Sequence, residues 1–265
     1  MTEFLRTLQL GAATITLINI GNLHADFTED GQTIEIPVQS ILIQLPEANI
    51  VVDTCLYDLP PDSSYGIPGY QPPPGLLARL REIGVLPERI KYVIITHTHF
   101  DHYNGATELR DGVYSPSFPN ARYYIGKADL DDPDMQQALQ DPTSLAGHTL
   151  AILQRLNMIE LVTGKQALND SIQIIPAPGE SPGHQIVRIH SQGETLYCLG
   201  DLYHDAHEIE HVDHMPYWAD QSAMLSSRAA LADAALAENA RLIVTHIPGI
   251  GRLERTDSGV RWQSV

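Results

Sequence analysis

Basic residues, cysteines and long apolar runs are all scarce in this sequence. Only 16 of its 265 residues are Lys or Arg, against 33 Asp or Glu, which gives a formal net charge of −17. An acidic surface repels phosphate backbones, so we expect no nucleic-acid partner. The longest apolar runs have the length of strands, so we expect no membrane-spanning helix and no membrane partner. The hydrophobic content of 43% favours a chain that buries a substantial core.

The two cysteines, Cys55 and Cys198, could form at most one disulfide. Cys198 lies in an apolar, strand-like run, where a buried free thiol is the expected state. This is not the disulfide framework of a small secreted protein. The N-terminus carries Glu3 and Arg6 and has no apolar signal core. We therefore expect a cytoplasmic protein.

Strand-like and helix-like segments alternate along the chain, with no low-complexity tail and no clean linker between them. The simplest interpretation is a single α/β (α+β) domain that spans residues 1–265. Strands are expected over 4–20 (broken at Gly11), 38–45, 49–53, 91–96, 159–162, 171–175, 185–190, 195–199 and 241–245, before a short β ending.

Helical patterns predict a short helix over 76–83 that ends at Gly84, a helix over 143–157, and an Ala-rich helix over 221–237 with Asp220 as its N-cap. We expect an irregular loop over 202–219. The segment 57–75 is rich in Pro, Tyr and Gly and is expected to form a long ordered loop. Its length favours a function, either as a lid or as a contact in a homodimer.

Four potential metal ligands lie within six residues at the end of the strand over 91–96. The run is His97-Thr98-His99-Phe100-Asp101-His102. On a turning backbone, the two pairs of ligands can face neighbouring positions. Imidazoles with a carboxylate suit zinc, iron, manganese or cobalt. The alternative, a solvated polar loop, does not explain four such residues at this spacing.

Three further candidate ligands lie beside other predicted strands. His184 precedes the strand over 185–190, Asp201 follows the strand over 195–199, and His246 follows the strand over 241–245. Ligands at strand ends can converge at one edge of a sheet, which is where α/β proteins usually place their sites.

The order His97-x-His99-x-Asp101-His102, then His184, Asp201 and His246, resembles the metallo-β-lactamase-fold hydrolases over nearly the whole chain. The family fold is an αββα four-layer sandwich with two metal ions at the edge of its sheets. The resemblance implies that His97, His99 and His184 hold one divalent metal ion, that Asp101, His102 and His246 hold a second, and that Asp201 bridges them. Zinc is the first expectation for both ions.

A second motif of the same family lies earlier in the chain. Val52-Asp53-Thr54 looks like the family's Asp-Thr-Gly turn, with Cys55 in place of the glycine. By this resemblance Asp53 is expected to orient one of the histidine ligands.

A dinuclear centre of this kind implies hydrolysis. Two close cations lower the pKa of a bridging water to about 7, and the resulting hydroxide attacks a carbonyl or phosphoryl centre. Asp101 or Asp201 could then pass a proton to the leaving alkoxide. No Ser or Cys nucleophile is required.

The ligand set narrows the branch of the family. Common zinc β-lactamases carry Cys at the position of Asp201, and ribonuclease Z requires a basic surface. Glyoxalase II carries a C-terminal helical domain, whereas 19 residues follow His246 here. The chain most resembles the quorum-quenching lactonases and methyl-parathion-type hydrolases. We therefore expect a metal-dependent hydrolase that opens an acyl-homoserine lactone-like ring or cleaves a small ester.

Two alternative activities stay open. One is hydrolysis of organophosphates or aryl esters. The other is a persulfide dioxygenase-like reaction at a single iron, since those proteins share the first motif. Acyl-homoserine lactonases usually carry a Tyr three residues after the bridging Asp. This chain has His204 at that position and Tyr203 one residue earlier, so either side chain is a candidate donor to the substrate carbonyl.

Other residues have weaker claims. His207, His211 and His214 have helical spacing and are either a hydrated face or a second metal site. His24, His148 and His190 are expected at the surface or in the core. An apolar substrate pocket could draw on the aromatic and apolar residues that flank the ligand segments, namely Tyr57, Tyr65, Tyr70, Phe100, Tyr103, Met215, Tyr217 and Trp218.

Overall fold

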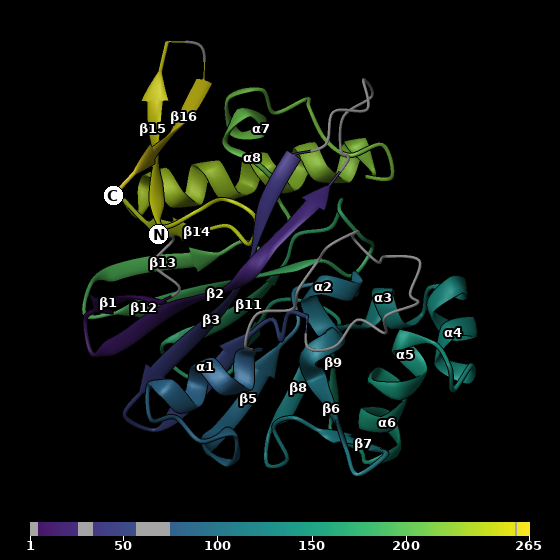
Figure 1. Cartoon of the computed structure of the whole chain (residues 1–265). Coiled ribbons are helices and arrows are strands. Elements are labelled where there is room, and N and C mark those ends of the chain that lie inside the picture. The colour runs from purple at the N-terminus through teal and green to yellow at the C-terminus, as the bar shows by residue number, and fades with distance from the viewer. Residues whose placement is uncertain (1–4, 26–33, 57–74, 258) are drawn as a thin grey trace.

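The described part of the chain forms two seven-stranded sheets with helices on their outer faces, together with a small two-stranded sheet (Figure 1). The computed structural model describes residues 5–25, 34–56, 75–257 and 259–265. Almost all of the predicted loop over 57–75, including Tyr57, Tyr65 and Tyr70, lies outside these residues. That residues 1–265 form a single domain stays a prediction.

The first sheet begins as an antiparallel meander and continues with parallel strands. Gly11, with a φ of +57°, turns the chain between its first two strands. Parallel neighbours require crossover connections, and helices supply them here. In spatial order the strands are β1 (Leu5–Leu10), β2 (Ala13–Ala25), β3 (Ile34–Leu45), β4 (Ala48–Val52), β5 (Ile90–Ile94), β8 (Arg122–Gly126) and β9 (Ile159–Val162).

The second sheet is antiparallel except for the pair β13 and β14, which α8 (Gln221–Ala237) connects. Asp220 caps this helix, since its Oδ1 accepts a hydrogen bond from the Ala223 N–H at 3.1 Å. The strands in spatial order are β10 (Gln166–Ala167), β11 (Ile172–Pro176), β12 (Gln185–Ser191), β13 (Glu194–Cys198), β14 (Arg241–Ile243), β15 (Gly251–Thr256) and β16 (Gly259–Ser264).

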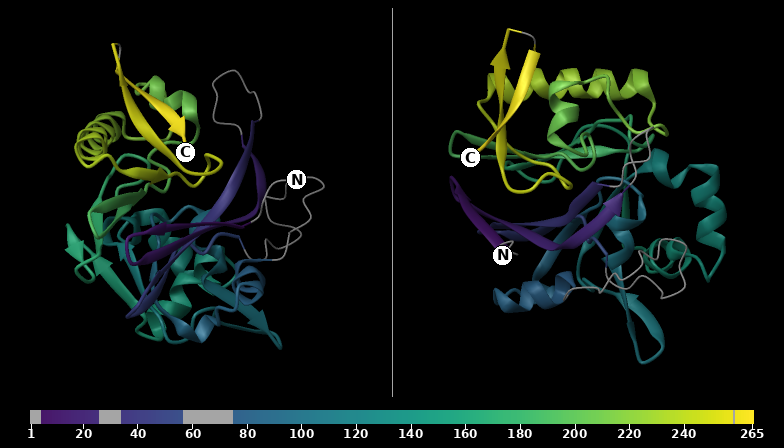
Figure 2. Two further views of the ribbon diagram at one scale, coloured as in Figure 1. Left: turned by 90° about the vertical axis from the view of Figure 1, so that its left-hand side faces the viewer. Right: turned by 45° about the horizontal axis from the view of Figure 1, so that its top comes forward.

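Alternating side chains bury both faces of each sheet. On β4, Val51 packs into the cluster under α1 (Leu76–Glu82), while its neighbours Ile50 and Val52 pack between the sheets. On β13, Leu196 faces the other sheet and Tyr197 faces α8. The right-hand view of Figure 2 shows the two sheets between α1 and α8. The layers are therefore α, β, β and α, and the expected fold class is confirmed.

Most of the predicted strands and helices are present, but two predictions were wrong. The helix over 143–157 is divided into α5 (Leu145–His148) and α6 (Leu150–Arg155). Thr149 leaves helical geometry at φ −120° and ψ −86°, and its hydroxyl bonds back to the Leu145 carbonyl. The predicted loop over 202–219 contains α7 (Ala206–Glu210), which Asp205 caps by accepting from the Glu208 N–H at 2.9 Å.

Between residues 103 and 142 we predict no element, yet the structure has several. Each is too short to carry a clear hydrophobic period, and β8 is fixed by pairing with β5 and β9 on either side. Besides β8, the elements here are η2 (Asn104–Ala106), β6 (Thr107–Arg110), β7 (Val113–Pro116), α3 (Lys127–Leu130) and α4 (Pro133–Gln140). The remaining short helices are η1 (Pro87–Arg89) and α2 (Phe100–Tyr103).

Within the described ranges, none of the helices combines the length and the apolar character that crossing a membrane requires.

Gln39 ties the first sheet to the loop that carries His246. Its buried amide Nε2 donates to the carbonyl oxygens of Val244, Thr245 and Ile247, at 3.2, 2.9 and 3.0 Å. We expect Gln39→Leu to lower the free energy of unfolding by about 1–3 kcal/mol, because it leaves buried carbonyls without a donor. Urea denaturation of the metal-free protein measures this change.

Gln44→Leu is the matched control. Gln44 lies on the same strand, is half-buried, and its amide makes no hydrogen bond to the described residues. An equal loss of stability in both variants would show that the Gln39 amide has no special role.

Candidate metal centre

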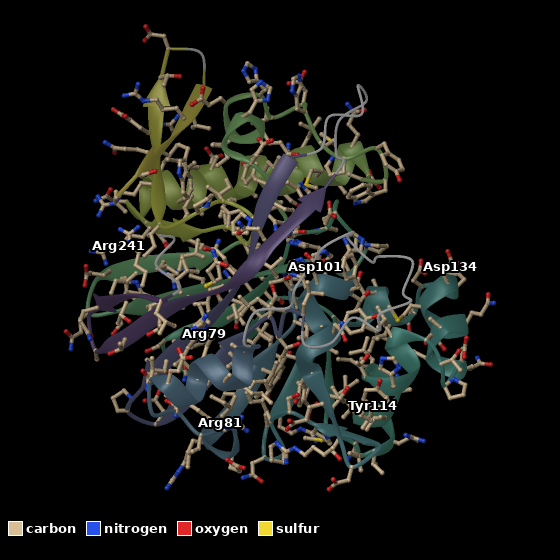
Figure 3. The ribbon with its side chains drawn as sticks, in the orientation of Figure 1. Arg79, Arg81, Asp101, Tyr114, Asp134 and Arg241 are labelled. Atoms are coloured by element: carbon tan, nitrogen blue, oxygen red, sulfur yellow. The ribbon has the colours of Figure 1, made fainter. Side chains whose placement is uncertain are left out.

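The first group of polar side chains lies at the end of β5 and in the short helix that follows. His97 comes three residues after the strand, and His99 is the N-cap residue of α2. Asp101 and His102 lie within that helical turn and are buried. Figure 3 shows Asp101 on α2, near the middle of the molecule in that view.

The second sheet supplies the remaining side chains from three loops at its strand ends. The loop between β11 and β12 carries Glu180 and His184, Asp201 follows β13, and His246 follows β14. Gly200 adopts the backbone conformation that brings Asp201 to the centre. It has a φ of +54°, and a Cβ there would lie 2.8 Å from His184 Nε2.

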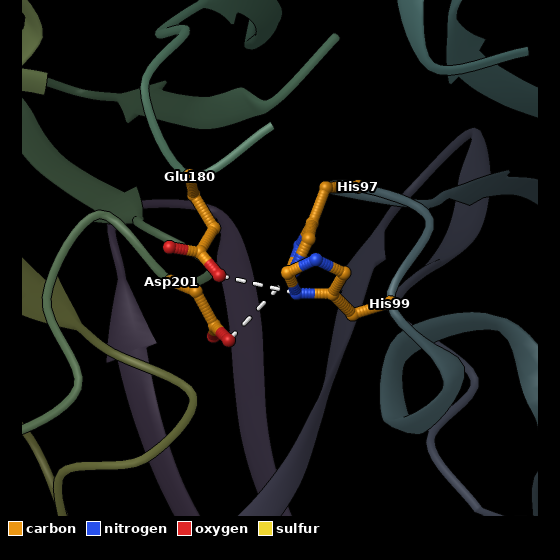
Figure 4. Close-up of side chains that lie close together, drawn as sticks. All are labelled: His97, His99, Glu180 and Asp201. Atoms are coloured by element: carbon orange, nitrogen blue, oxygen red, sulfur yellow. Dashed lines mark ion pairs between the residues drawn. The ribbon is translucent and has the colours of Figure 1, made fainter. Parts of the chain in front are cut away.

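Two donor groups form where these loops meet. In each group the ligand atoms lie within 4.8 Å of one another. The first consists of His97, His99, Glu180 and Asp201 (Figure 4), and the second of Asp101, His102 and His246.

Asp201 contacts rings from both groups. Its Oδ2 lies 3.8 Å from His97 Nε2, 3.2 Å from His102 Nε2 and 3.1 Å from His246 Nε2. The same oxygen lies 3.6 Å from His204 Nε2. One carboxylate oxygen therefore sits between the two donor groups.

Hydrogen bonds from the far side fix the histidine rings. The Nδ1–H of His184 donates to the Ala177 carbonyl, and that of His246 donates to the Pro37 carbonyl, both at 2.8 Å. These bonds assign the proton to Nδ1 and leave Nε2 facing the centre. Outer hydrogen bonds of this kind orient metal-binding histidines.

Asp53 holds the third ring. His102 Nδ1 lies 2.8 Å from its Oδ2. Thr96 anchors the carboxylate, with its N–H 2.7 Å from Oδ1 and its hydroxyl 2.8 Å from Oδ2. Asp53 and Cys55 have φ values of +57° and +56°, which few non-glycine residues adopt. The turn is therefore strained at the position where the carboxylate meets its histidine.

The buried charges strongly perturb one another. Burial and the nearby His102 ring hold the pKa of His97 well below its usual value. Burial also disfavours charge on His102, but the Asp201 and Asp101 carboxylates outweigh it and raise the pKa of His102 well above its usual value. In the same way His102 and His246 overcome burial and hold the pKa of Asp201 well below its usual value.

This donor set suits metal ions. Asp53, Asp101, Glu180 and Asp201 are each at most 6% exposed, and buried charges are normally paired or bound to metals. Within the part of the chain that the structure describes, His97 Nε2 and Asp201 Oδ1 are buried without hydrogen-bond partners. Imidazole and carboxylate donors match zinc, iron, manganese and cobalt.

The structure brings the seven expected ligands to one place but groups them differently. We expect His184 beside His97 and His99, whereas the compact first group contains Glu180 instead. His184 lies next to that group, with its ring centroid 5.3 Å from that of His97. Sequence reasoning missed Glu180. The one available signal was a carboxylate between two Pro-Gly pairs in the loop that ends at His184.

The two candidate donors, Tyr203 and His204, lie in different surroundings. Tyr203 packs in the cluster between the second sheet and α8, with the Arg228 guanidinium 4.6 Å from its ring centroid. His204 is buried and faces the centre, with Nε2 3.6 Å from both Asp201 Oδ2 and Glu180 Oε1. Arg228 also donates to Glu208 Oε2 at 2.5 Å, next to His204.

An aromatic pair adjoins the centre. Trp218 lies edge-on to His99 and His204, with ring centroids 6.0 and 6.3 Å apart, and is 38% exposed. Tyr217 contacts Trp218 and is 85% exposed. Tyr103, by contrast, belongs to the core of the first sheet.

Among the described side chains, the other histidines do not reach the centre. His207, His211 and His214 are exposed, and their ring centroids lie 4.2 to 5.4 Å apart at the surface. His148 stacks on Tyr114 with centroids 4.3 Å apart, and His190 is 3.0 Å from the Thr195 hydroxyl. The side chain of His24 lies outside the described residues.

Known proteins resemble this chain in sequence. N-acyl homoserine lactonase of Bacillus cereus is 24% identical over 183 residues, which cover 64% of this chain and 64% of that protein. The N-acyl homoserine lactonase of Bacillus thuringiensis is 23% identical over 189 residues, which cover 65% of this chain and 67% of that protein. The match thus spans less than two thirds of the Bacillus cereus protein.

Solved structures show the same fold. The hydrolase AbOPH of the beta lactamase superfamily has a TM-score of 0.80 at 16% identity, over 100% of this chain and 98% of that chain. The dizinc quorum-quenching lactonase AidC has a TM-score of 0.78 at 20% identity, over 98% and 97%.

The model of one protein family covers most of the sequence. It is described as the metallo-beta-lactamase superfamily and matches residues 34–246. The chain belongs to the metallo-beta-lactamase superfamily.

Proposed function

We propose that the protein is a two-metal hydrolase that opens a lactone ring, with acyl-homoserine lactones as its first candidate substrates and zinc as its first candidate metal. The observation that carries this proposal is the position of Asp201, whose Oδ2 lies 3.8 Å from His97 Nε2 and 3.1 Å from His246 Nε2. A carboxylate shared between two donor groups can hold two cations side by side. The names of the lactonase relatives suggest the substrate class.

Two bound cations would supply an activated water and a polarised substrate carbonyl. The protein's own groups then manage the protons. Asp101 and Asp201 are buried carboxylates beside the His246 ring, 3.4 and 3.1 Å from its Nε2. Either can accept the proton of the attacking water and return it to the leaving alkoxide oxygen. The product of lactone opening is a hydroxy acid.

His204 is the candidate donor to the substrate carbonyl. Its Nδ1 lies 3.4 Å from Glu208 Oε2, so Nε2 is the nitrogen that faces the centre. Burial disfavours charge on His204, but the surrounding carboxylates outweigh it and raise the pKa of His204 well above its usual value. In this imidazolium form both ring nitrogens carry a proton, and the Nε2–H can stabilise the negative charge that grows on the carbonyl oxygen during attack. The exposed rings of Tyr217 and Trp218 offer an apolar surface for an acyl chain.

Substrate assays of the metal-loaded protein test the proposed function. We expect ring opening of acyl-homoserine lactones, measured by the acid released as each ester becomes a carboxylate. Paraoxon-type phosphotriesters and aryl esters serve as comparison substrates. Turnover of phosphotriesters without any turnover of lactones would replace this proposal with organophosphate hydrolysis. One iron per chain with oxygen consumption on a persulfide would replace it with dioxygenase chemistry.

Asp201→Asn tests the shared carboxylate. Loss of its charge weakens both donor groups, so we expect metal content to fall from about two ions per chain and kcat/KM to fall more than about 100-fold. Elemental analysis and lactone kinetics measure the two effects. Asp233→Asn, the same change at an exposed position of α8, is the control. If Asp201→Asn kept both metal and activity, Asp201 would not belong to the centre.

His204→Phe tests the proposed donor. We expect kcat to fall about 100- to 1000-fold, the usual cost of removing one donor to a developing oxyanion, while metal content stays unchanged. His204→Tyr, which restores a donor, should recover part of the rate. Stopped-flow or steady-state lactone kinetics with parallel metal analysis measure both. An unchanged kcat in His204→Phe would remove His204 from the reaction.

A further inference from the structure

Glu180 has no role in the function described so far, although its carboxylate lies inside the first donor group. We propose that Glu180 is an additional ligand of the metal position formed by His97, His99 and Asp201. The inference rests on the two-metal centre of the proposed function and does not depend on the substrate.

The spacing of the donors supports a shared ion. Glu180 Oε1 lies 3.1 Å from His99 Nδ1, and His97 Nε2 lies 3.8 Å from Asp201 Oδ2 (Figure 4). Two ligand atoms at about 2.0–2.2 Å from one tetrahedral ion are about 3.3–3.6 Å apart. The observed separations bracket that range, so small side-chain movements would place all four atoms around one cation.

Burial makes the carboxylate costly without a cation. Glu180 is 3% exposed, and its Oε2 has no hydrogen-bond partner among the residues that the structure describes. Its Oε1 accepts a hydrogen bond from Trp218 Nε1 at 2.8 Å. A carboxylate has about four lone-pair sites, so it can keep the indole bond and still offer an oxygen to a metal.

The loop that carries Glu180 is fixed on α8. Ser227 Oγ donates to the Pro178 carbonyl at 2.7 Å, and the Asp220 N–H donates to the Gly179 carbonyl at 2.9 Å. Gly179 has a φ of +144°, and a Cβ there would lie 2.5 Å from the Met224 Cα. The backbone at Gly179 therefore packs directly on α8, which leaves the neighbouring Glu180 little freedom to turn away from the centre.

A ligand role has a consequence for metal choice. Because Asp201 is shared with the second donor group, Glu180 adds the one carboxylate charge that belongs to this position alone. Carboxylate oxygens suit manganese and other hard ions better than imidazole nitrogens do. Glu180 should therefore strengthen the binding of every divalent ion tested and favour manganese relative to zinc.

A purely structural role is the rival explanation. In that case Glu180 would only link His99 to the indole of Trp218, and the ion would bind without it. Glu180→Gln removes the charge but keeps the size and an acceptor for the indole. Trp218→Phe removes the indole hydrogen bond and leaves the carboxylate, so it is the matched control.

The test measures metal binding rather than turnover. Metal-free wild-type protein and both variants are titrated with zinc and manganese against a chelator, and the visible spectrum of the cobalt-loaded proteins is recorded. We expect Glu180→Gln to weaken one of the two metal positions at least about 10-fold, more for manganese than for zinc, and to change the cobalt spectrum. Trp218→Phe, which keeps the carboxylate charge, should change affinity and spectrum clearly less than Glu180→Gln does.

Two results would overturn the ligand role. One is wild-type affinity and spectrum in Glu180→Gln, and the other is an equal change in both variants. If Glu180→Gln fails to fold, the pair Glu180→Asp and Glu180→Ala replaces it. Glu180→Asp keeps the charge and should bind manganese more tightly than Glu180→Ala. Equal affinities in that second pair would also reject the proposal. Absence of lactone turnover in the wild-type protein would instead affect the proposed function alone.

Discussion

Four buried carboxylates at the junction of the two sheets are the constraint on which the rest of the structure depends. Asp53, Asp101, Glu180 and Asp201 are almost withdrawn from water, and each would be strongly destabilising alone. Their neighbours are mainly histidine rings, backbone N–H groups and the side chains of Thr96 and Trp218. This site therefore needs positive charge to be stable, either on protonated histidine rings or on bound metal ions.

The sandwich positions these groups because its strands end at the same edge. Contacts that cross between the sheets keep the loops in register. The Gln39 amide, on the first sheet, holds the carbonyls around His246 on the second. In return, Gln185 on the second sheet donates to the Ile95 carbonyl at 2.8 Å, two residues before His97. Relative movement of the sheets would break both sets of hydrogen bonds. The geometry of the site therefore depends on the packing between the sheets.

Sequence reasoning reached the candidate ligands whose signal is local and missed the one that depends on the fold. His97 to His102 could be found because four donors follow one strand, and His184, Asp201 and His246 because each adjoins a predicted strand. Glu180 had no such signal, since only the packing of its loop on α8 brings it to His99. Tyr203 and His204 could not be separated from the sequence, because the direction of a side chain after β13 depends on the turn at Gly200 and on Arg228.

The contacts of Glu180 connect two parts of the site that are usually considered separately. One oxygen meets both His99, a candidate ligand, and the indole of Trp218, part of the aromatic surface beside the centre. His204 lies 3.6 Å from that same oxygen, and the Glu208 and Arg228 pair supports it from behind. The proposed donor to the substrate, the Trp218 ring and one proposed metal position therefore share a single buried carboxylate. A change of charge at Glu180 must act on all three at once, whereas a change at Trp218 removes one hydrogen bond from the carboxylate and leaves its charge.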